Sequence, residues 1–207
     1  AFFKAANCFT YRKHLADHIL PGVTGPGGEQ YLKYWGDNAS EPYNADLFES
    51  YKSWIADLVA KGFDGAFFDV LDSYQRPDVQ AAIWGADAGA DTLIATTALL
   101  NIISDLMDYA HTLDPGFKIV LGHNPYLIGN YVFPGGAGNG NVDQALIDHI
   151  QAGVDGVIYE SIDLTNAALM ADLRGSLSPT GAYGFGGATQ LAAWYYPGSG
   201  PFVDGDP

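Results

Sequence analysis

Two acidic residues, Asp69 and Glu160, stand at the same position of two similar octets. Residues 62–69 read GFDGAFFD and residues 153–160 read GVDGVIYE, so each joins a Gly/Asp turn to a short apolar run that ends on a carboxylate. Glycoside cleavage requires two carboxylates around one bond, because one protonates the leaving oxygen while the other attacks the anomeric carbon or activates water. Asp69 and Glu160 are therefore our candidate catalytic residues, in a chemistry that needs no metal or cofactor.

The same two acids also have a structural interpretation. Each could cap the helix that follows its strand, or accept hydrogen bonds from loop amides. For one acid alone this interpretation is the stronger. For Asp69 and Glu160 together, each at the end of a matching octet, catalysis is favoured.

The elements around the octets alternate between helix and strand. Asn44 is expected to cap a first helix and Gly62 to end it, while Asp114-Pro115-Gly116 should stop a second. A polar stretch from Asp72 to Asp91 is predicted to be a long loop. The other predicted elements are helices over 44–61, 91–113, 142–151 and 166–173, and strands over 65–69, 118–124 and the apolar part of 153–160.

This alternation indicates parallel strands joined by crossover helices. In such folds the active site lies at the carboxyl ends of the strands, where the loops converge. We therefore predict an α/β fold, a single domain over residues 1–207, with Asp69 and Glu160 at the rim of the sheet or barrel.

Five further residues near these strand ends are candidates for binding a sugar. Asp72 and Tyr74 follow the first strand, and His123 and Asn124 close the strand between the two acids. Tyr159 precedes Glu160 and could equally pack, just as Asn124 could simply form a turn before a proline. Aromatic residues that could serve as sugar platforms, or pack in core and loops, are Trp84, Trp194, Tyr195 and Tyr196.

Metal and nucleophile chemistries have weaker signals. Asp69, Asp72 and His123 could hold a divalent ion, as a metal-dependent deacetylase would require. His14 and His18 are spaced like a helical metal pair, but Leu15 occupies the place of the glutamate in that motif. No serine lies in a G-x-S-x-G elbow. We expect no bound metal.

The charge balance limits the classes of molecule that the protein is expected to bind. The chain carries 24 acidic and 9 basic residues, a net charge of −15, which disfavours nucleic acid and permits a neutral or cationic partner. Its 26 glycines and many aromatics are typical of secreted, glycan-active proteins, and Cys8 has no second cysteine for a disulfide. No membrane span is expected, and the first residues do not read as a signal peptide. We expect an extracellular monomer whose signal peptide lies outside the chain shown.

Several motifs together resemble the glycoside hydrolase family 114 of endo-α-1,4-polygalactosaminidases and related glycosidases. They are GFDGAFFDVLDSY, the asparagine of IVLGHN, GVDGVIYES and, more distantly, GEQYLKYW, all within residues 28–162. The resemblance implies a (β/α)8 TIM-like barrel and endo-hydrolysis of α-1,4-linked galactosamine polymers. It implies Asp69 as nucleophile, Glu160 as acid/base, and Asp72 and Asn124 as pocket residues. A partly deacetylated polymer of this kind is polycationic, which suits the charge.

The chain departs from the family pattern in length and in its visible strands. A barrel of this kind typically has about 250 residues, and neither the first 27 residues nor the segment after Glu160 shows a clear strand. We therefore expect a compact, divergent or incomplete barrel. A non-catalytic glycan-binding protein on the same scaffold is the main alternative to an enzyme.

Overall fold

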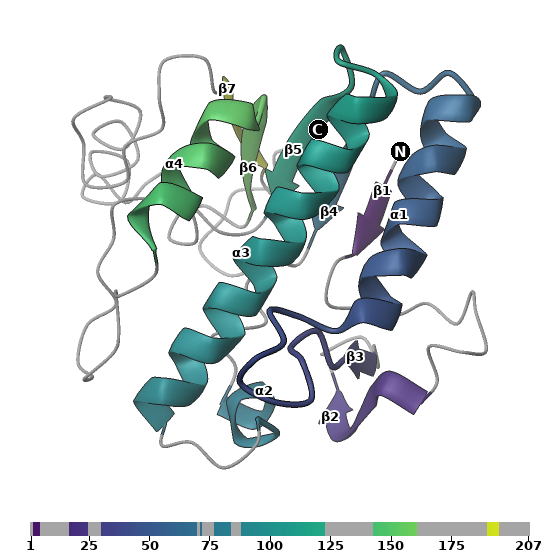
Figure 1. The fold of residues 1–207 in the computed structure, drawn as a ribbon. Helices are drawn as coiled ribbons and strands as arrows, with labels where there is room; N and C mark the ends of the chain where they lie inside the picture. The colour runs from purple at the N-terminus through teal and green to yellow at the C-terminus, as the bar shows by residue number, and fades with distance from the viewer. Residues whose placement is uncertain are drawn as a thin grey trace.

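The computed structural model describes residues 2–4, 17–24, 30–69, 71, 77–83, 88–122, 143–160 and 190–194. These residues form seven strands and four helices (Figure 1). In chain order they are β1 (Phe2–Lys4), β2 (Ile19–Thr24), β3 (Gln30–Leu32), α1 (Ala45–Ala60), β4 (Gly65–Asp69), α2 (Pro77–Ala81), α3 (Ala88–Leu113), β5 (Lys118–Gly122), α4 (Gln144–Gly153), β6 (Gly156–Glu160) and β7 (Gln190–Trp194).

Five strands form one parallel sheet in the order β1-β4-β5-β6-β7, and β2 and β3 pair separately as an antiparallel ladder. Figure 1 shows α1, α3 and α4 in front of the strands, on one side of the sheet. Parallel strands linked by helices that cover a face define the α/β class, which confirms that part of the prediction. Closure into an eight-stranded barrel goes beyond the described residues and stays a prediction.

Strands lie in both segments where the sequence showed no clear strand: β1 and β2 precede residue 28, and β7 follows Glu160. β1 has only three residues, and β7 reads QLAAW, so neither shows a clear strand pattern. Their neighbours make them strands: β1 pairs with the last three residues of β4, and β7 pairs with β6 along all five residues. Tertiary pairing therefore outweighs the weak local preference.

The predicted loop between Asp72 and Asp91 is also wrong in part. It contains the short helix α2, and α3 begins at Ala88 rather than at residue 91. Proline is well suited to the first position of a helix, where its missing N–H costs nothing, and Pro77 takes that position in α2. α4 lies two residues later than predicted, over Gln144–Gly153.

Helix α1 follows the sequence signals closely. The side chain of Asn44 accepts a hydrogen bond from Leu47 N at 3.1 Å, so it caps the helix as predicted. After the C-cap residue Lys61, Gly62 adopts a φ of 76°, a left-handed conformation that favours glycine. The chain can then turn directly into β4.

Helix α3 is the centre of the described core, because it packs against α1, α2 and α4. Its 21-residue segment Leu93–Leu113 contains an 18-residue window with a mean hydropathy of 1.2, so by length and composition it could cross a membrane. Most of this segment is buried against its neighbours, as in the central helix of a water-soluble core. Its buried apolar side chains are Ala95, Ala98, Leu99, Leu100, Ile102, Ile103, Leu106, Met107 and Ala110.

Gly65 starts β4 in very close contact with β5. A Cβ atom at this position would lie 2.8 Å from the Lys118 Cβ and closer still to the Lys118 carbonyl oxygen. This carbonyl belongs to the backbone of the adjacent strand, so it has little room to move. Gly65, the second glycine of the octet 62–69, is therefore required by the packing of β4 against β5.

We predict that Gly65→Ala lowers the free energy of unfolding by roughly 1–3 kcal/mol, because the methyl group must push two paired strands apart. Urea unfolding followed by circular dichroism measures this loss. Gly116→Ala is a suitable control, since its Cβ would meet only the Asp114 Oδ1 at 3.3 Å. Equal stability of the Gly65→Ala and native proteins would contradict the close packing of these strands.

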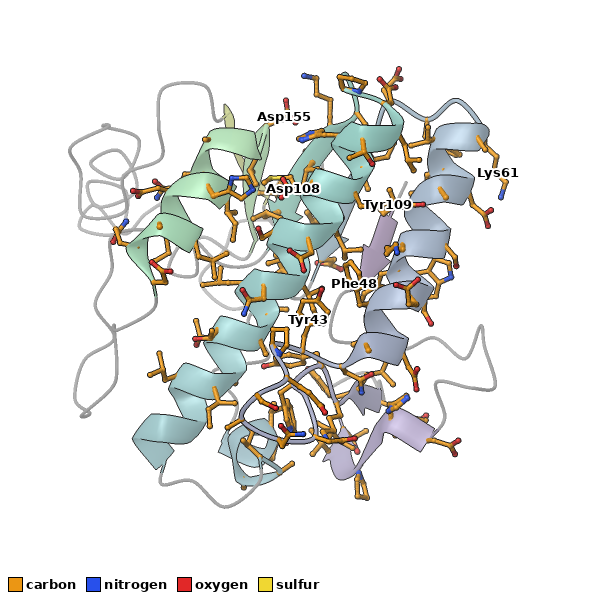
Figure 2. The ribbon with its side chains drawn as sticks, in the orientation of Figure 1. Tyr43, Phe48, Lys61, Asp108, Tyr109 and Asp155 are labelled. Atoms are coloured by element: carbon orange, nitrogen blue, oxygen red, sulfur yellow. The ribbon has the colours of Figure 1, made fainter. Side chains whose placement is uncertain are left out.

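Tyr43 attaches the segment before α1 to α3. Its hydroxyl donates a hydrogen bond to the Asp105 carboxylate, and Figure 2 shows Tyr43 close to α3. The pKa of Tyr43 is raised, first by burial and then by the hydrogen bond and negative charge of Asp105, with a smaller contribution from Glu49. The folded protein therefore keeps this phenol protonated at a pH where the unfolded chain ionises it.

The raised pKa of Tyr43 should be visible in how the free energy of unfolding depends on pH. An ordinary tyrosine ionises near pH 10, so the stabilisation is complete below that pH and is lost as the pH rises above it. We expect the free energy of unfolding of the native protein to fall more steeply between about pH 9.5 and 11.5 than that of Tyr43→Phe. Parallel pH profiles of the two proteins would contradict the assignment.

Candidate active site

Asp69 and Glu160 are the last residues of β4 and β6. Both strands run parallel to β5, which lies between them, so both acids end at the carboxyl edge of the same sheet. This is the edge at which parallel α/β folds place their active sites. The structure therefore brings the two candidate residues, which are far apart in sequence, to one side of the molecule.

The register also places both acids on one face of the sheet. Phe68 pairs with Leu121, which pairs with Val157, so these three positions share a face. Because successive residues of a strand alternate between faces, Asp69 and Glu160 both belong to the opposite face. Glu160 stands two residues further along its strand than the position level with Asp69.

The helices cover the face of the sheet opposite to the one on which Asp69 and Glu160 lie. On β4 and β5, the residues of that face are almost fully buried and join the core cluster. Phe67 and Val120, on the face of the acids, are only partly buried. The buried residues on the opposite face, which the helices cover, are Ala66, Phe68, Ile119 and Leu121. Asp69 and Glu160 thus belong to the side of the sheet away from the helical layer, which a closed barrel would turn inward.

The strand spacing bears on whether the two carboxylates can cooperate. Adjacent strands lie about 4.8 Å apart, so β4 and β6 are separated by about 10 Å across β5. Carboxyl pairs in glycosidases lie about 5–5.5 Å apart when configuration is retained and about 6.5–9.5 Å apart when it is inverted. Glu160 also stands two residues further along, which adds about 6.6 Å along the strand and puts the two backbones roughly 12 Å apart. The carboxyl groups would therefore reach these separations only if the side chains lean toward each other.

Asp69 itself is only 3% exposed. A buried carboxylate has lost its hydration and is stable only with interaction partners, and Asp69 does have partners in the structure. The register also sets Lys4 of β1 beside it, a basic residue that sequence analysis did not connect with the site. The three-residue strand that carries Lys4 has no pattern that would have revealed it.

The aspartate in the turn of the second octet has a structural task at the opposite end of the strands. Asp155 Oδ2 accepts a hydrogen bond from Ile119 N at 3.0 Å, and Asp155 Oδ1 pairs with Lys118 Nζ at 2.8 Å. Asp155 N also donates to Ile119 O at 2.9 Å. Asp155 raises the pKa of Lys118, mainly through their hydrogen bond and also through its charge. These contacts fix β5 against β6, so the octet combines a clamp at one end with an acid at the other.

Most of the other predicted binding residues lie outside the described residues. This applies to Asp72, Tyr74, His123 and Asn124, and to the aromatic candidates Trp84, Tyr195 and Tyr196. Tyr159 lies in β6 and, by strand alternation, belongs to the face opposite Glu160. Trp194 pairs with Glu160 in the register of β6 and β7, so it shares the face of the acids.

The histidine pair proposed as a weak metal site has a different role at its described member. His18 Nε2 lies 3.1 Å from Asp46 Oδ2, and His18 Nδ1 lies 3.0 Å from Asn44 Nδ2. Both ring nitrogens are thus engaged in supporting the capped start of α1. His14 lies outside the described residues.

Among the described residues, no three histidine, cysteine or acidic side chains form a group that could hold a metal ion. Two members of the alternative metal site, Asp72 and His123, are beyond that part of the chain. The metal alternative therefore stays open.

Sequence comparison finds no match for the chain, either among family models or among curated proteins. Its structure resembles the glycoside hydrolase domain of PelA from Pseudomonas aeruginosa, with a TM-score of 0.58 and 14% identity over 96% of this chain and 67% of that one. A variant of the same domain gives a TM-score of 0.51 and 15% identity over 86% of this chain and 59% of that one.

A third similar structure is that of Aspergillus fumigatus Ega3 in complex with galactosamine. Its TM-score of 0.36, with 14% identity over 93% of this chain and 73% of that one, is too low to support an argument. The likeness to the PelA domain shows a shared fold. The chain spans about two thirds of that domain or less.

We predict that Asp155→Ala lowers the free energy of unfolding by roughly 1–3 kcal/mol, because the Ile119 N–H loses its acceptor. Urea unfolding measures the loss, and faster hydrogen exchange of the Ile119 amide would locate it between β5 and β6. Asp148→Ala removes an exposed acid that accepts a hydrogen bond from its helix neighbour Gln144, and it should change little. Unchanged exchange at Ile119 would contradict the clamp.

Proposed function

We propose that this chain is a glycoside hydrolase that cleaves an α-1,4-linked, galactosamine-containing polysaccharide with Asp69 and Glu160. The observation that supports it most is the strand register, which brings the two acids to one edge and one face of a parallel sheet. The fold shared with the PelA domain adds a scaffold that serves as a glycoside hydrolase domain in another protein.

In the proposed mechanism, Glu160 donates its proton to the glycosidic oxygen while the Asp69 carboxylate attacks the anomeric carbon. The bond to the leaving sugar breaks, and a covalent glycosyl–Asp69 ester forms. Glu160, now ionised, then accepts a proton from a water molecule that attacks the same carbon and releases Asp69. Two inversions at one carbon leave the product with the configuration of the substrate. The tight packing around Asp69 suits a nucleophile that must stay in place.

The choice of substrate rests on the sequence motifs and on charge. Residues 62–74 and 153–161 resemble the polygalactosaminidase family, and the chain has a net charge of −15. An acidic protein attracts a polymer with protonated amino groups and repels a polyanion. We place this activity outside the cell, in a monomeric protein that needs no cofactor.

The burial of Asp69 also favours a second candidate function. A carboxylate that is 3% exposed can hold the sheet edge together without touching a substrate. The protein would then bind glycan on this scaffold without cleaving it. The enzyme and the binding protein differ in whether the two carboxylates are required for product formation.

We predict that Asp69→Asn and Glu160→Gln each reduce cleavage by a factor of roughly 10²–10⁴ and leave the fold intact, because each removes one acid–base or nucleophilic group. The assay is incubation with galactosaminogalactan, chitosan and neutral galactan, followed by mass analysis of the products. Asp64→Asn is the matched control, since Asp64 is the exposed acid at the other end of the same octet.

Three results would contradict the proposal. Binding without cleavage of any polymer by the native protein would favour the glycan-binding function. Loss of activity on adding a chelator would favour a metal-dependent enzyme that uses Asp69 with Asp72 and His123. Full activity in Asp69→Asn and Glu160→Gln would exclude the two-carboxylate mechanism.

A further inference from the structure

A pocket of about 230 Å³ lies between the 35–42 loop and helix α3. None of its lining residues belongs to the parallel sheet, and neither Asp69 nor Glu160 is among them. Figure 1 shows the segment between β3 and α1 beside the N-terminal half of α3, at the end of the fold toward which β1 and β4 point. The pocket and the candidate active site therefore share one end of the molecule.

The size of the pocket fits a small ligand. A water molecule occupies about 30 Å³ of liquid, so the space corresponds to roughly eight waters. Drug-sized ligands use pockets of about 300 Å³ or more. A single sugar ring is a ligand of suitable size, whereas a long polymer segment can place only one unit inside.

The lining suits the two kinds of surface that a sugar ring presents. Leu93 and Trp35 contribute to an apolar wall, with proline, alanine and isoleucine neighbours. Asn38, Thr97 and Asn101 supply amide and hydroxyl groups that can bind sugar hydroxyls. A pyranose has apolar C–H faces and a polar rim of hydroxyls, so it can use both parts of this lining.

The charge of the lining points to an amino sugar. Glu41 is the one charged residue among the described residues that line the pocket. Glu41 Oε2 accepts a hydrogen bond from Asp37 N at 2.6 Å, and Glu41 Oε1 accepts one from Asn38 Nδ2 at 2.8 Å. A carboxylate has about four acceptor sites, so Glu41 can still accept a bond from a ligand ammonium group.

Trp35, one of the lining residues, has a buried indole N–H. Trp35 is 1% exposed, and its Nε1 has no hydrogen-bond acceptor among the residues that the structure describes. A buried N–H without an acceptor is costly.

The loop that forms the pocket is held in place before any ligand arrives. Gly36 packs so closely on Glu41 that an added Cβ would lie 3.0 Å from Glu41 Oε2 and nearer still to other Glu41 atoms. Tyr43 bonds to Asp105 of α3, and Lys33 pairs with Asp37. A preformed site avoids much of the entropy cost of ordering a loop on binding.

We infer that this pocket binds one amino-sugar unit of a polysaccharide, as a second glycan-binding site outside the catalytic edge. The inference takes its sugar class from the proposed function, while its location and its preference for a protonated amine come from the lining. Glu41 contacts the ammonium group, and Asn101 and Asn38 bind ring hydroxyls. The site holds the polymer and performs no chemistry on it.

The test is a titration of the ¹⁵N-labelled native protein with galactosamine, N-acetylgalactosamine and glucose, followed by NMR. We expect saturable shifts of the Trp35 indole and of the Asn38 and Asn101 side-chain amides, strongest with galactosamine. Asn101→Leu keeps the volume but removes the amide, and should weaken binding roughly fivefold or more. Gln144→Leu is the matched control on α4, outside the pocket, and should bind like the native protein.

Two further variants separate this site from the catalytic edge. Glu41→Gln should reduce the preference for galactosamine over N-acetylgalactosamine, because the carboxylate charge is gone. Asp69→Asn should leave the shifts at the pocket unchanged, whether or not the chain proves to be a hydrolase. Shifts that disappear in Asp69→Asn but persist in Asn101→Leu would place the sugar at the catalytic edge. That result, or the absence of saturable shifts at the pocket, would overturn the inference.

Discussion

The parallel register of β4, β5 and β6 is the constraint on which the candidate active site depends. A shift of one residue in either pairing would move Asp69 or Glu160 to the other face of the sheet, because strand residues alternate between faces. The observed pairing of Phe68, Leu121 and Val157 avoids this and leaves both acids on the same side. Any account of cooperation between these carboxylates therefore begins with what holds the register.

The register is held at the amino ends of the strands, away from the acids. Gly65 lets β4 approach Lys118, whose N–H donates to Asp64 O at 2.8 Å, and Asp155 binds the start of β5 from the other side. Each octet thus places packing and clamping residues at one end of its strand and a carboxylate at the other. This division of tasks leaves the carboxyl ends free to carry chemistry, as is usual in parallel α/β folds.

Local signals predicted the elements that carry strong patterns of their own. Asn44 and Gly62 predict the two ends of α1, and the apolar runs before Asp69 and Glu160 predict β4 and β6. β1 and β7 could not be predicted in this way, because FFK and QLAAW become strands only by pairing with neighbours. The alternation of helix and strand did indicate that the two acids share an edge, but their common face depends on the register, which no local pattern encodes.

The pocket could not be predicted because its parts are distant in sequence and unremarkable alone. Asn38 and Glu41 look like ordinary turn residues, and Asn101 looks like a polar position on an apolar helix. They come together only in the folded chain, where the bond from Tyr43 to Asp105 is one contact that joins the loop to α3.

If the pocket binds a sugar unit, its position at the catalytic end of the fold has a consequence for a polymeric substrate. A chain held at one site presents its other units to the second site at a high effective concentration, without any further contact. A weak pocket for one amino sugar would then increase the occupancy of the Asp69–Glu160 edge by long chains but not by single sugars. A cationic polymer gains further from the net charge of −15, because every protonated unit is attracted and not only the two that are bound.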